Sequence, residues 1–211
     1  MRRVSTCRLR YGVAVSLDGF IAGTAGEYDW IVMDPSIDFA RMFKQFDTAV
    51  MGRKTYEVLT AQGGHGELPG LDVVVFSRTL PPATYPGVRI VNDNPATVVA
   101  ALKTKSSAKD IWLYGGGELF RGLLDAGLVD TVEVAVIPVL LGSGVPLLPP
   151  GAATKLVLSD HKVLPASGIV ALSYSVPGGQ GPAPAITYVK ASKARSTQAK
   201  QTRSRKRSRA R

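Results

Sequence analysis

Residues 110–124 read Asp110-Ile-Trp-Leu-Tyr-Gly-Gly-Gly-Glu-Leu-Phe-Arg-Gly-Leu-Leu124, and this stretch decides the fold. An apolar run stops at three consecutive glycines, and apolar residues at helical spacing follow at once, so the pattern predicts a strand, a tight turn and an amphipathic helix. Glycines let the main chain approach a ligand closely, and a helix N-terminus adds unpaired N–H donors and a partial positive charge. The pattern therefore indicates an anion site, although a turn that binds nothing explains a single triple glycine as well.

A second segment, residues 47–59, follows the same logic. Its apolar run meets Gly52, and the predicted helix that follows carries Arg53, Lys54 and Thr55 in its first turn. Cations at this position oppose the helix dipole unless an anion is bound there, and such local conflicts are typical of functional sites. The alternative is a solvated basic turn.

The third segment is a β-branched strand, residues 71–76, that ends in Ser77-Arg78-Thr79. Two hydroxyls and a guanidinium fork suit a phosphate monoester, while a polar cap on the strand is the alternative. Ligands of open α/β sheets bind beyond the carboxyl ends of the strands. Three strand ends with anion-binding chemistry therefore predict one phosphate-bearing ligand.

The rest of the chain alternates strand and helix patterns and finishes with a strand pair. This order predicts an α/β fold with a mixed, mostly parallel sheet flanked by helices and an antiparallel C-terminal hairpin. The expected strands are residues 8–16, 72–77, 88–91, 131–138, 155–164 and 168–176, and the expected helices, besides those after the glycine turns, are residues 37–46 and 94–105.

Composition limits the class of protein. The 211 residues, 45% of them hydrophobic, suffice for one domain with a substantial core. The longest apolar stretch, residues 134–141, contains Pro138 and is too short to span a bilayer, and the N-terminus lacks the apolar region of a signal peptide. We therefore expect a cytoplasmic protein without a membrane partner. With one cysteine and two histidines, no metal site is expected.

The net charge of +10 arises from the C-terminus. Residues 190–211 hold ten Lys or Arg and no acid, whereas residues 1–189 balance 16 basic against 16 acidic side chains. We expect a folded domain over residues 1–176, a Pro/Gly-rich linker over 177–189 and a disordered basic tail over 190–211. Such a tail could bind nucleic acid non-specifically by neutralising phosphates, or remain solvated.

Several segments, in this order, resemble the dihydrofolate-reductase-like superfamily, and more closely the bacterial group that includes the reductase domain of riboflavin-biosynthesis deaminase–reductases. The resemblance extends over roughly residues 8–176. It is carried by Ser16-Leu-Asp-Gly-Phe-Ile-Ala22, Asp29-Trp30, Val50-Met-Gly-Arg-Lys-Thr-Tyr-Glu57, Phe76-Ser-Arg78, Leu113-Tyr-Gly-Gly-Gly-Glu118, Ile137-Pro138 and Gly142-Ser-Gly-Val-Pro146.

The resemblance implies a homodimer and an NADPH molecule that lies along the carboxyl edge of the sheet. By this resemblance, the residues that flank the pyrophosphate are Gly52, Arg53, Lys54 and Thr55 on one side and Gly115, Gly116, Gly117, Glu118 and Leu119 on the other. Ser77 and Arg78 would hold the 2′-phosphate, and Ala14 and Ile21 would border the nicotinamide.

The substrate residues are less determined. Asp18 directly follows the first strand and is the candidate catalytic side chain, although a turn with Gly19 explains it equally well. Trp30 could stack on a flat heterocycle or be a buried aromatic residue. Asp34 lies near the position where dihydrofolate reductases carry a carboxylate, but it precedes Pro35 in a predicted loop.

We therefore expect an NADPH-dependent reductase that transfers a hydride to a small substrate. The substrate would be a pteridine- or pyrimidine-like heterocycle, or another compound with a carbonyl or imine group, reduced at C=N or C=O. The alternative is a non-catalytic nucleotide-binding module that its basic tail tethers to nucleic acid.

Overall fold

The computed structural model describes residues 7–61, 63–104 and 109–181. The nucleic-acid-binding tail predicted at 190–211 lies outside these residues and stays a prediction, as does most of the linker. The elements are β1 (Leu9–Ser16), β2 (Phe20–Ala22), α1 (Phe39–Phe43), β3 (Phe46–Gly52), α2 (Arg53–Thr60), β4 (Asp72–Phe76), β5 (Ala83–Tyr85), β6 (Val88–Val91), α3 (Pro95–Lys103), β7 (Asp110–Gly115), α4 (Gly117–Asp125), β8 (Thr131–Ile137), β9 (Val145–Pro146), β10 (Val157–Leu164) and β11 (Ile169–Ser175).

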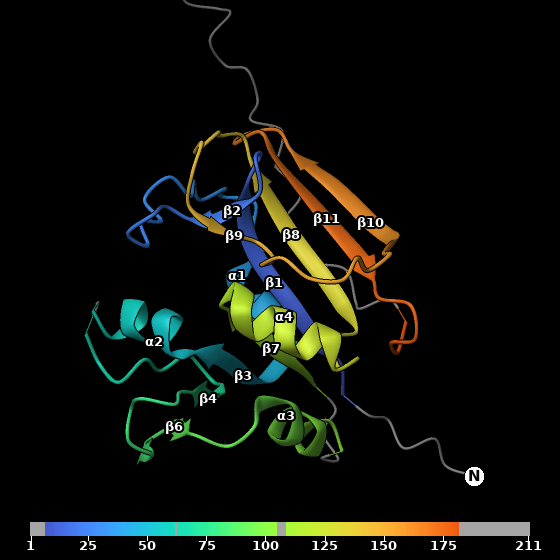
Figure 1. The fold of residues 1–211 in the computed structure, drawn as a ribbon. Helices are drawn as coiled ribbons and strands as arrows, with labels where there is room; N and C mark the ends of the chain where they lie inside the picture. Colours follow the sequence, from blue (N-terminus) through green and yellow to red (C-terminus); the bar gives the residue numbers. More distant parts are fainter. Residues whose placement is uncertain (1–6, 62, 105–108, 182–211) are drawn as a thin grey trace, which may run out of the picture.

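A nine-stranded sheet in the order β10-β11-β8-β1-β7-β3-β4-β6-β5 forms the centre of the molecule (Figure 1). The six strands from β8 to β6 are parallel, whereas β11, β10 and β5 pair antiparallel with their neighbours. This arrangement confirms the predicted mixed sheet with its C-terminal hairpin. Residues 83–85, which are not among the expected strands, form an additional edge strand on β6.

Helices cover both faces of the parallel strands. α3 and α4 pack on the face that presents Leu9, Tyr11 and Leu113, whereas α1 and α2 cover the face that presents Met51 and Trp112. Alternate residues of each strand supply the two cores, because successive side chains of a strand point to opposite faces.

Helix α1 is shorter than the predicted helix 37–46. It begins after Asp38, whose carboxylate accepts a hydrogen bond from the Arg41 backbone N–H at 2.9 Å and so caps the helix. Phe46, expected at the end of the helix, instead starts β3 and stacks on Trp112 with 5.3 Å between ring centroids. The aromatic contact across the sheet outweighs the helical spacing of the local sequence.

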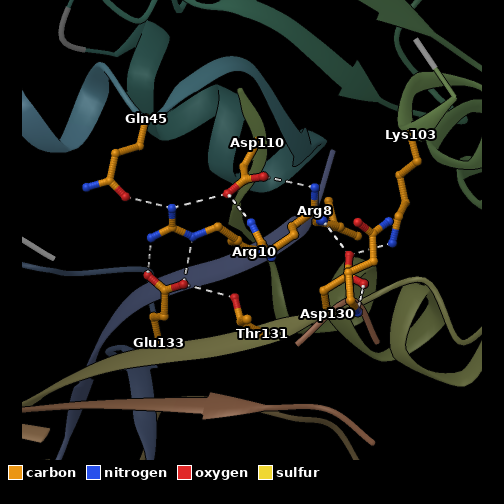
Figure 2. Close-up of polar contacts among 10 residues, drawn as sticks. Arg8, Arg10, Gln45, Lys103, Asp110, Asp130, Thr131 and Glu133 are labelled. Carbon is orange, nitrogen blue, oxygen red and sulfur yellow. Dashed lines mark hydrogen bonds and ion pairs between the residues drawn. The ribbon is translucent and has the colours of Figure 1, made fainter. Parts of the chain in front are cut away.

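A buried polar network joins the amino ends of the central strands (Figure 2). Arg10 on β1 is fully buried and binds Glu133 on β8 through Nε at 2.7 Å and Nη2 at 2.8 Å. Its Nη1 donates to Gln45 at 2.7 Å and to Asp110 at 3.4 Å. This network holds β1, β7 and β8 together at the amino edge of the sheet. The two glycine turns and the turn at Ser77-Arg78 lie at the opposite, carboxyl edge.

No helix of the described residues is long and apolar enough to cross a membrane.

Candidate functional site

The three turns predicted to bind phosphate meet at one edge of the sheet. Gly52 at the end of β3 is in register with Phe76 at the end of β4, and Met51 is in register with Gly115 at the end of β7. Parallel pairing places the carboxyl ends of the three strands side by side. Segments separated by about 60 residues in the sequence thus form one continuous surface.

The triple glycine is required by space as well as by backbone angle. Gly116 has φ 98° and ψ 108°, a conformation in which side chains are strained. A Cβ atom on Gly115 would lie 3.0 Å from the Thr55 side chain, and one on Gly117 would lie 2.9 Å from the carbonyl oxygen of Pro146. The first turn of α2 and the end of β9 therefore approach the glycine turn as closely as bare backbone allows.

Helices α2 and α4 differ from the other two helices at their N-termini. α1 and α3 are capped by side chains, with Asn94 accepting from the Ala96 N–H at 2.9 Å. Gly52 and Gly116, the N-cap residues of α2 and α4, offer no side-chain cap. The amides of both first turns, which have no partner within their own helix, remain available to an anion in the groove.

The cations expected at this edge lie on its surface. Arg53 is half-buried and pairs with Glu57 one turn further along α2, with Nη1 and Oε1 2.7 Å apart, whereas Lys54 and Arg78 are exposed. The Ser77 hydroxyl accepts the backbone N–H of Leu80 at 2.8 Å, which fixes the turn that carries Arg78. A solvent-facing guanidinium beside an ordered hydroxyl suits a phosphate monoester.

A single open groove with a volume of about 1800 Å³ joins these turns to the uncovered part of the sheet. The predicted cofactor residues that line it are Ala14, Ile21, Gly52, Arg53, Lys54, Thr55, Ser77, Arg78, Gly115, Gly116, Gly117, Glu118 and Leu119. The glycine cradle, the two uncapped helix ends and the three cations fit a dinucleotide with a pyrophosphate and a further phosphate. Within the described residues, no cluster of three or more His, Cys, Asp or Glu side chains could hold a metal ion.

Asp18 does not line this groove. Its carboxylate accepts hydrogen bonds from the Ser16 hydroxyl at 2.6 Å and from the backbone N–H groups of Leu141 and Gly142 at 3.1 and 2.7 Å. The Ser16 hydrogen bond, together with the backbone donors, lowers the pKa of Asp18 below its usual range. The side chain thus joins the end of β1 to the loop after β8.

Asp34 and Trp30 also lie outside the residues that line the groove. Asp34 is buried and accepts the hydroxyl groups of Ser167 and Ser36, both at 2.5 Å, and these hydrogen bonds lower its pKa. Trp30 donates its indole N–H to the Glu27 carbonyl at 3.0 Å and packs against the apolar cluster around Ile137. The structure brings neither of these predicted substrate residues to the cofactor edge.

Two aromatic residues that were not predicted from the sequence also line the groove. Trp112 and Tyr114 alternate on β7, so both point to the face opposite Leu113, and their rings meet edge to face with centroids 4.8 Å apart. The Trp112 indole donates to the Gly12 carbonyl at 3.1 Å, and a Cβ on Gly12 would lie 2.9 Å from that indole nitrogen. The alternation along residues 110–115 was the available signal, but the fold was needed to show which face borders the groove.

The topology and the groove together define a protein of the dihydrofolate-reductase-like class. Residues 8–170 match the model of the RibD C-terminal domain, and the chain belongs to this family.

The chain has sequence relatives among uncharacterized proteins and among riboflavin biosynthesis proteins. The uncharacterized protein YyaP of Bacillus subtilis is 38% identical over 66% of this chain and 79% of its own length. The riboflavin biosynthesis protein RibD of Mycobacterium tuberculosis is 29% identical over 68% of this chain, and the match spans 46% of RibD.

Solved structures share the fold, and two of them serve as examples. The putative riboflavin biosynthesis protein from Shewanella sp. PV-4 has a TM-score of 0.70 at 24% identity, over 80% of this chain and 98% of that one. The diaminohydroxyphosphoribosylaminopyrimidine deaminase/5-amino-6-(5-phosphoribosylamino)uracil reductase from Thermotoga maritima has a TM-score of 0.58 at 16% identity, over 81% of this chain and 57% of that one.

Proposed function

We propose that the protein is an NADPH-dependent reductase that transfers a hydride to a C=N or C=O bond of a small pyrimidine- or pteridine-like heterocycle. Membership of a reductase-domain family supports the oxidoreductase class. The observation that carries the cofactor assignment is the convergence of two uncapped helix N-termini and three cations on one groove.

Different residues at the carboxyl edge of the sheet bind different parts of the coenzyme. The amides of the first turns of α2 and α4, with Arg53 and Lys54, hold the pyrophosphate, because helix N-termini and cations favour anions. Ser77 and Arg78 hold the 2′-phosphate at the end of β4. Ala14 and Ile21 form a small apolar border for the nicotinamide and exclude water from it. The bound coenzyme supplies the hydride.

Asp18 serves this site as a positioning residue in our proposal, in place of the catalytic role expected from its sequence position. Its carboxylate already accepts three hydrogen bonds and holds the 141–142 loop against the end of β1. A carboxylate with a lowered pKa is also a poor proton donor at neutral pH.

Titration of the protein with NADPH, followed by coenzyme fluorescence, tests the proposal. The double variant Arg53→Ala/Arg78→Ala should weaken binding by more than about tenfold, because each lost charge-assisted hydrogen bond is worth about 1.5–3 kcal/mol. Arg78→Ala alone should reduce the preference for NADPH over NADH. Arg89→Ala, on the exposed side of neighbouring β6 and outside the groove, is the matched control and should bind like the parent protein. If neither coenzyme binds at millimolar concentration, the proposal fails.

We also propose that the protein is a homodimer, as its resemblance to the reductase group implies, and that it acts in the cytoplasm. Light scattering at micromolar concentration tests the dimer: a monomeric mass would contradict it.

A further inference from the structure

The four cations that line the groove are unevenly distributed along it. Among the described residues these are Arg10, Arg53, Lys54 and Arg78. The last three follow β3 and β4 at the carboxyl edge, where the proposed coenzyme carries its phosphates. Only Arg10 lies away from that edge.

Arg10 is not available to a ligand. Its side chain has no exposed surface, and its guanidinium is committed to Glu133, Gln45 and Asp110. The Phe46 ring covers it further, with the guanidinium carbon 4.6 Å from the ring centroid. Freeing this cation would strand Glu133 as an unpaired buried carboxylate, which is strongly unfavourable.

The part of the groove beyond Ala14 has apolar walls. Segment 31–43 contributes Ile31, Val32, Met33, Ile37, Met42 and Phe43, of which Val32 and Met33 are exposed at 46% and 67%. Ile31, Ile37 and Ala14 share one apolar cluster, which places this wall next to the proposed nicotinamide border. Unpartnered apolar side chains at a groove are typical of a binding surface.

Aromatic rings and phenol groups complete this end. Phe43 and Tyr114 each meet the Trp112 ring edge to face, with centroids 5.4 and 4.8 Å from it. Burial raises the pKa of the Tyr114 phenol, with a smaller contribution from nearby Tyr28, so Tyr114 is protonated and can donate a hydrogen bond. Such a surface favours flat rings and neutral polar groups.

We infer that the substrate is a neutral, flat heterocycle without a phosphate group, held by the apolar wall at segment 31–43 and the ring surface of β7. The inference rests on the proposed function, because it assigns the three edge cations to the coenzyme. It separates this chain from the Thermotoga maritima relative, whose name specifies a phosphoribosylamino substrate. Among the described residues that line this end of the groove there is no available cation, so a phosphate there would lose its hydration against apolar side chains.

Isothermal titration of the NADP⁺-saturated full-length protein tests the inference with two probes. They are 5-amino-6-(ribosylamino)uracil and its 5′-phosphate, which differ only in the charged group. The neutral compound should bind at least about tenfold more tightly than its phosphate, a difference of about 1.4 kcal/mol. Tighter binding of the phosphate, or no binding of the neutral compound, would overturn the inference.

A charge variant adds an independent test. Met33→Arg places a cation in the exposed part of the wall and should shift the ratio toward the phosphate by about tenfold, whereas Met33→Gln, a matched uncharged variant, should leave the ratio unchanged. An unchanged ratio in Met33→Arg would also overturn the inference. A titration of the protein with NADP⁺ alone tests the proposed function separately. A protein that binds the coenzyme but prefers the phosphorylated probe keeps the proposed function and loses only this inference.

Discussion

Replacement of Arg10 by Met should severely destabilise the protein. The substitution keeps most of the side-chain volume but leaves Glu133, exposed at 5%, without the cation that binds it, and removes the closer of the two arginines beside Asp110, exposed at 8%. Removing one partner of a buried ion pair costs about 3–5 kcal/mol, because an uncompensated charge stays in the interior. Since domains of this size unfold with about 5–15 kcal/mol, the variant would lose a large part of its stability.

Urea denaturation followed by tryptophan fluorescence at neutral pH measures this loss. The double variant Arg10→Met/Glu133→Leu should recover much of it, because both charges of the Arg10–Glu133 pair are then absent. Arg53→Met is the matched control: it breaks the exposed pair with Glu57 and should cost less than about 1 kcal/mol. A loss below about 1 kcal/mol for Arg10→Met, or a double variant less stable than both single variants, would refute the reasoning.

Three further predictions follow from the geometry of the groove and its supports. Gly116→Ala should destabilise the protein by about 1–3 kcal/mol and weaken NADPH binding, because the φ of 98° at this position strains any side chain. Gly122→Ala, inside α4 where a Cβ meets no other atom, should instead stabilise the protein by about 0.5–1 kcal/mol. Thermal unfolding and coenzyme titration compare the two variants. Asp34→Asn should be destabilising at neutral pH, because serine hydroxyls hold the pKa of the Asp34 carboxyl below its usual range. The stability that this carboxylate contributes is complete above the unfolded pKa of about 3.9 and is lost as pH falls through the lower folded pKa. Unfolding measured from pH 7 downward should therefore show parent and variant converging in acid, and a constant difference would contradict the assignment. Tyr114→Phe should weaken binding of the neutral probe about fivefold through loss of one hydrogen bond, with NADP⁺ affinity unchanged, and equal probe affinities by calorimetry would exclude a role for the hydroxyl.

The sequence determined the parts of the fold that depend on local pattern. The triple glycine at 115–117 and Gly52 each lie between a strand and a helix, as the apolar runs and glycine chemistry predict. The alternation of elements also predicted the mixed sheet and its C-terminal hairpin. All thirteen residues predicted to bind the cofactor line one groove, and the eleven at the ends of β3, β4 and β7 do so because parallel strands bring their carboxyl ends to the same edge.

Other features depended on partners that are distant in the sequence. Asp18 was the candidate catalytic residue and Asp34 a candidate substrate residue, but their carboxylates accept hydrogen bonds from donors at 141–142 and at Ser167, more than 120 residues away. The short strand 83–85 exists because β6 offers it a free edge, which no local pattern reveals.

The proposed substrate end of the groove likewise depends on tertiary contacts. The helices that cover one face of β7 decide whether Trp112 and Tyr114 face a core or a groove. Glu133 on a neighbouring strand decides whether Arg10 can bind a ligand. Sequence alone thus determined the strand–glycine–helix units, because backbone chemistry acts over a few residues. Tertiary structure decided which charges are free and which are bound to one another, because that depends on contacts across the sheet.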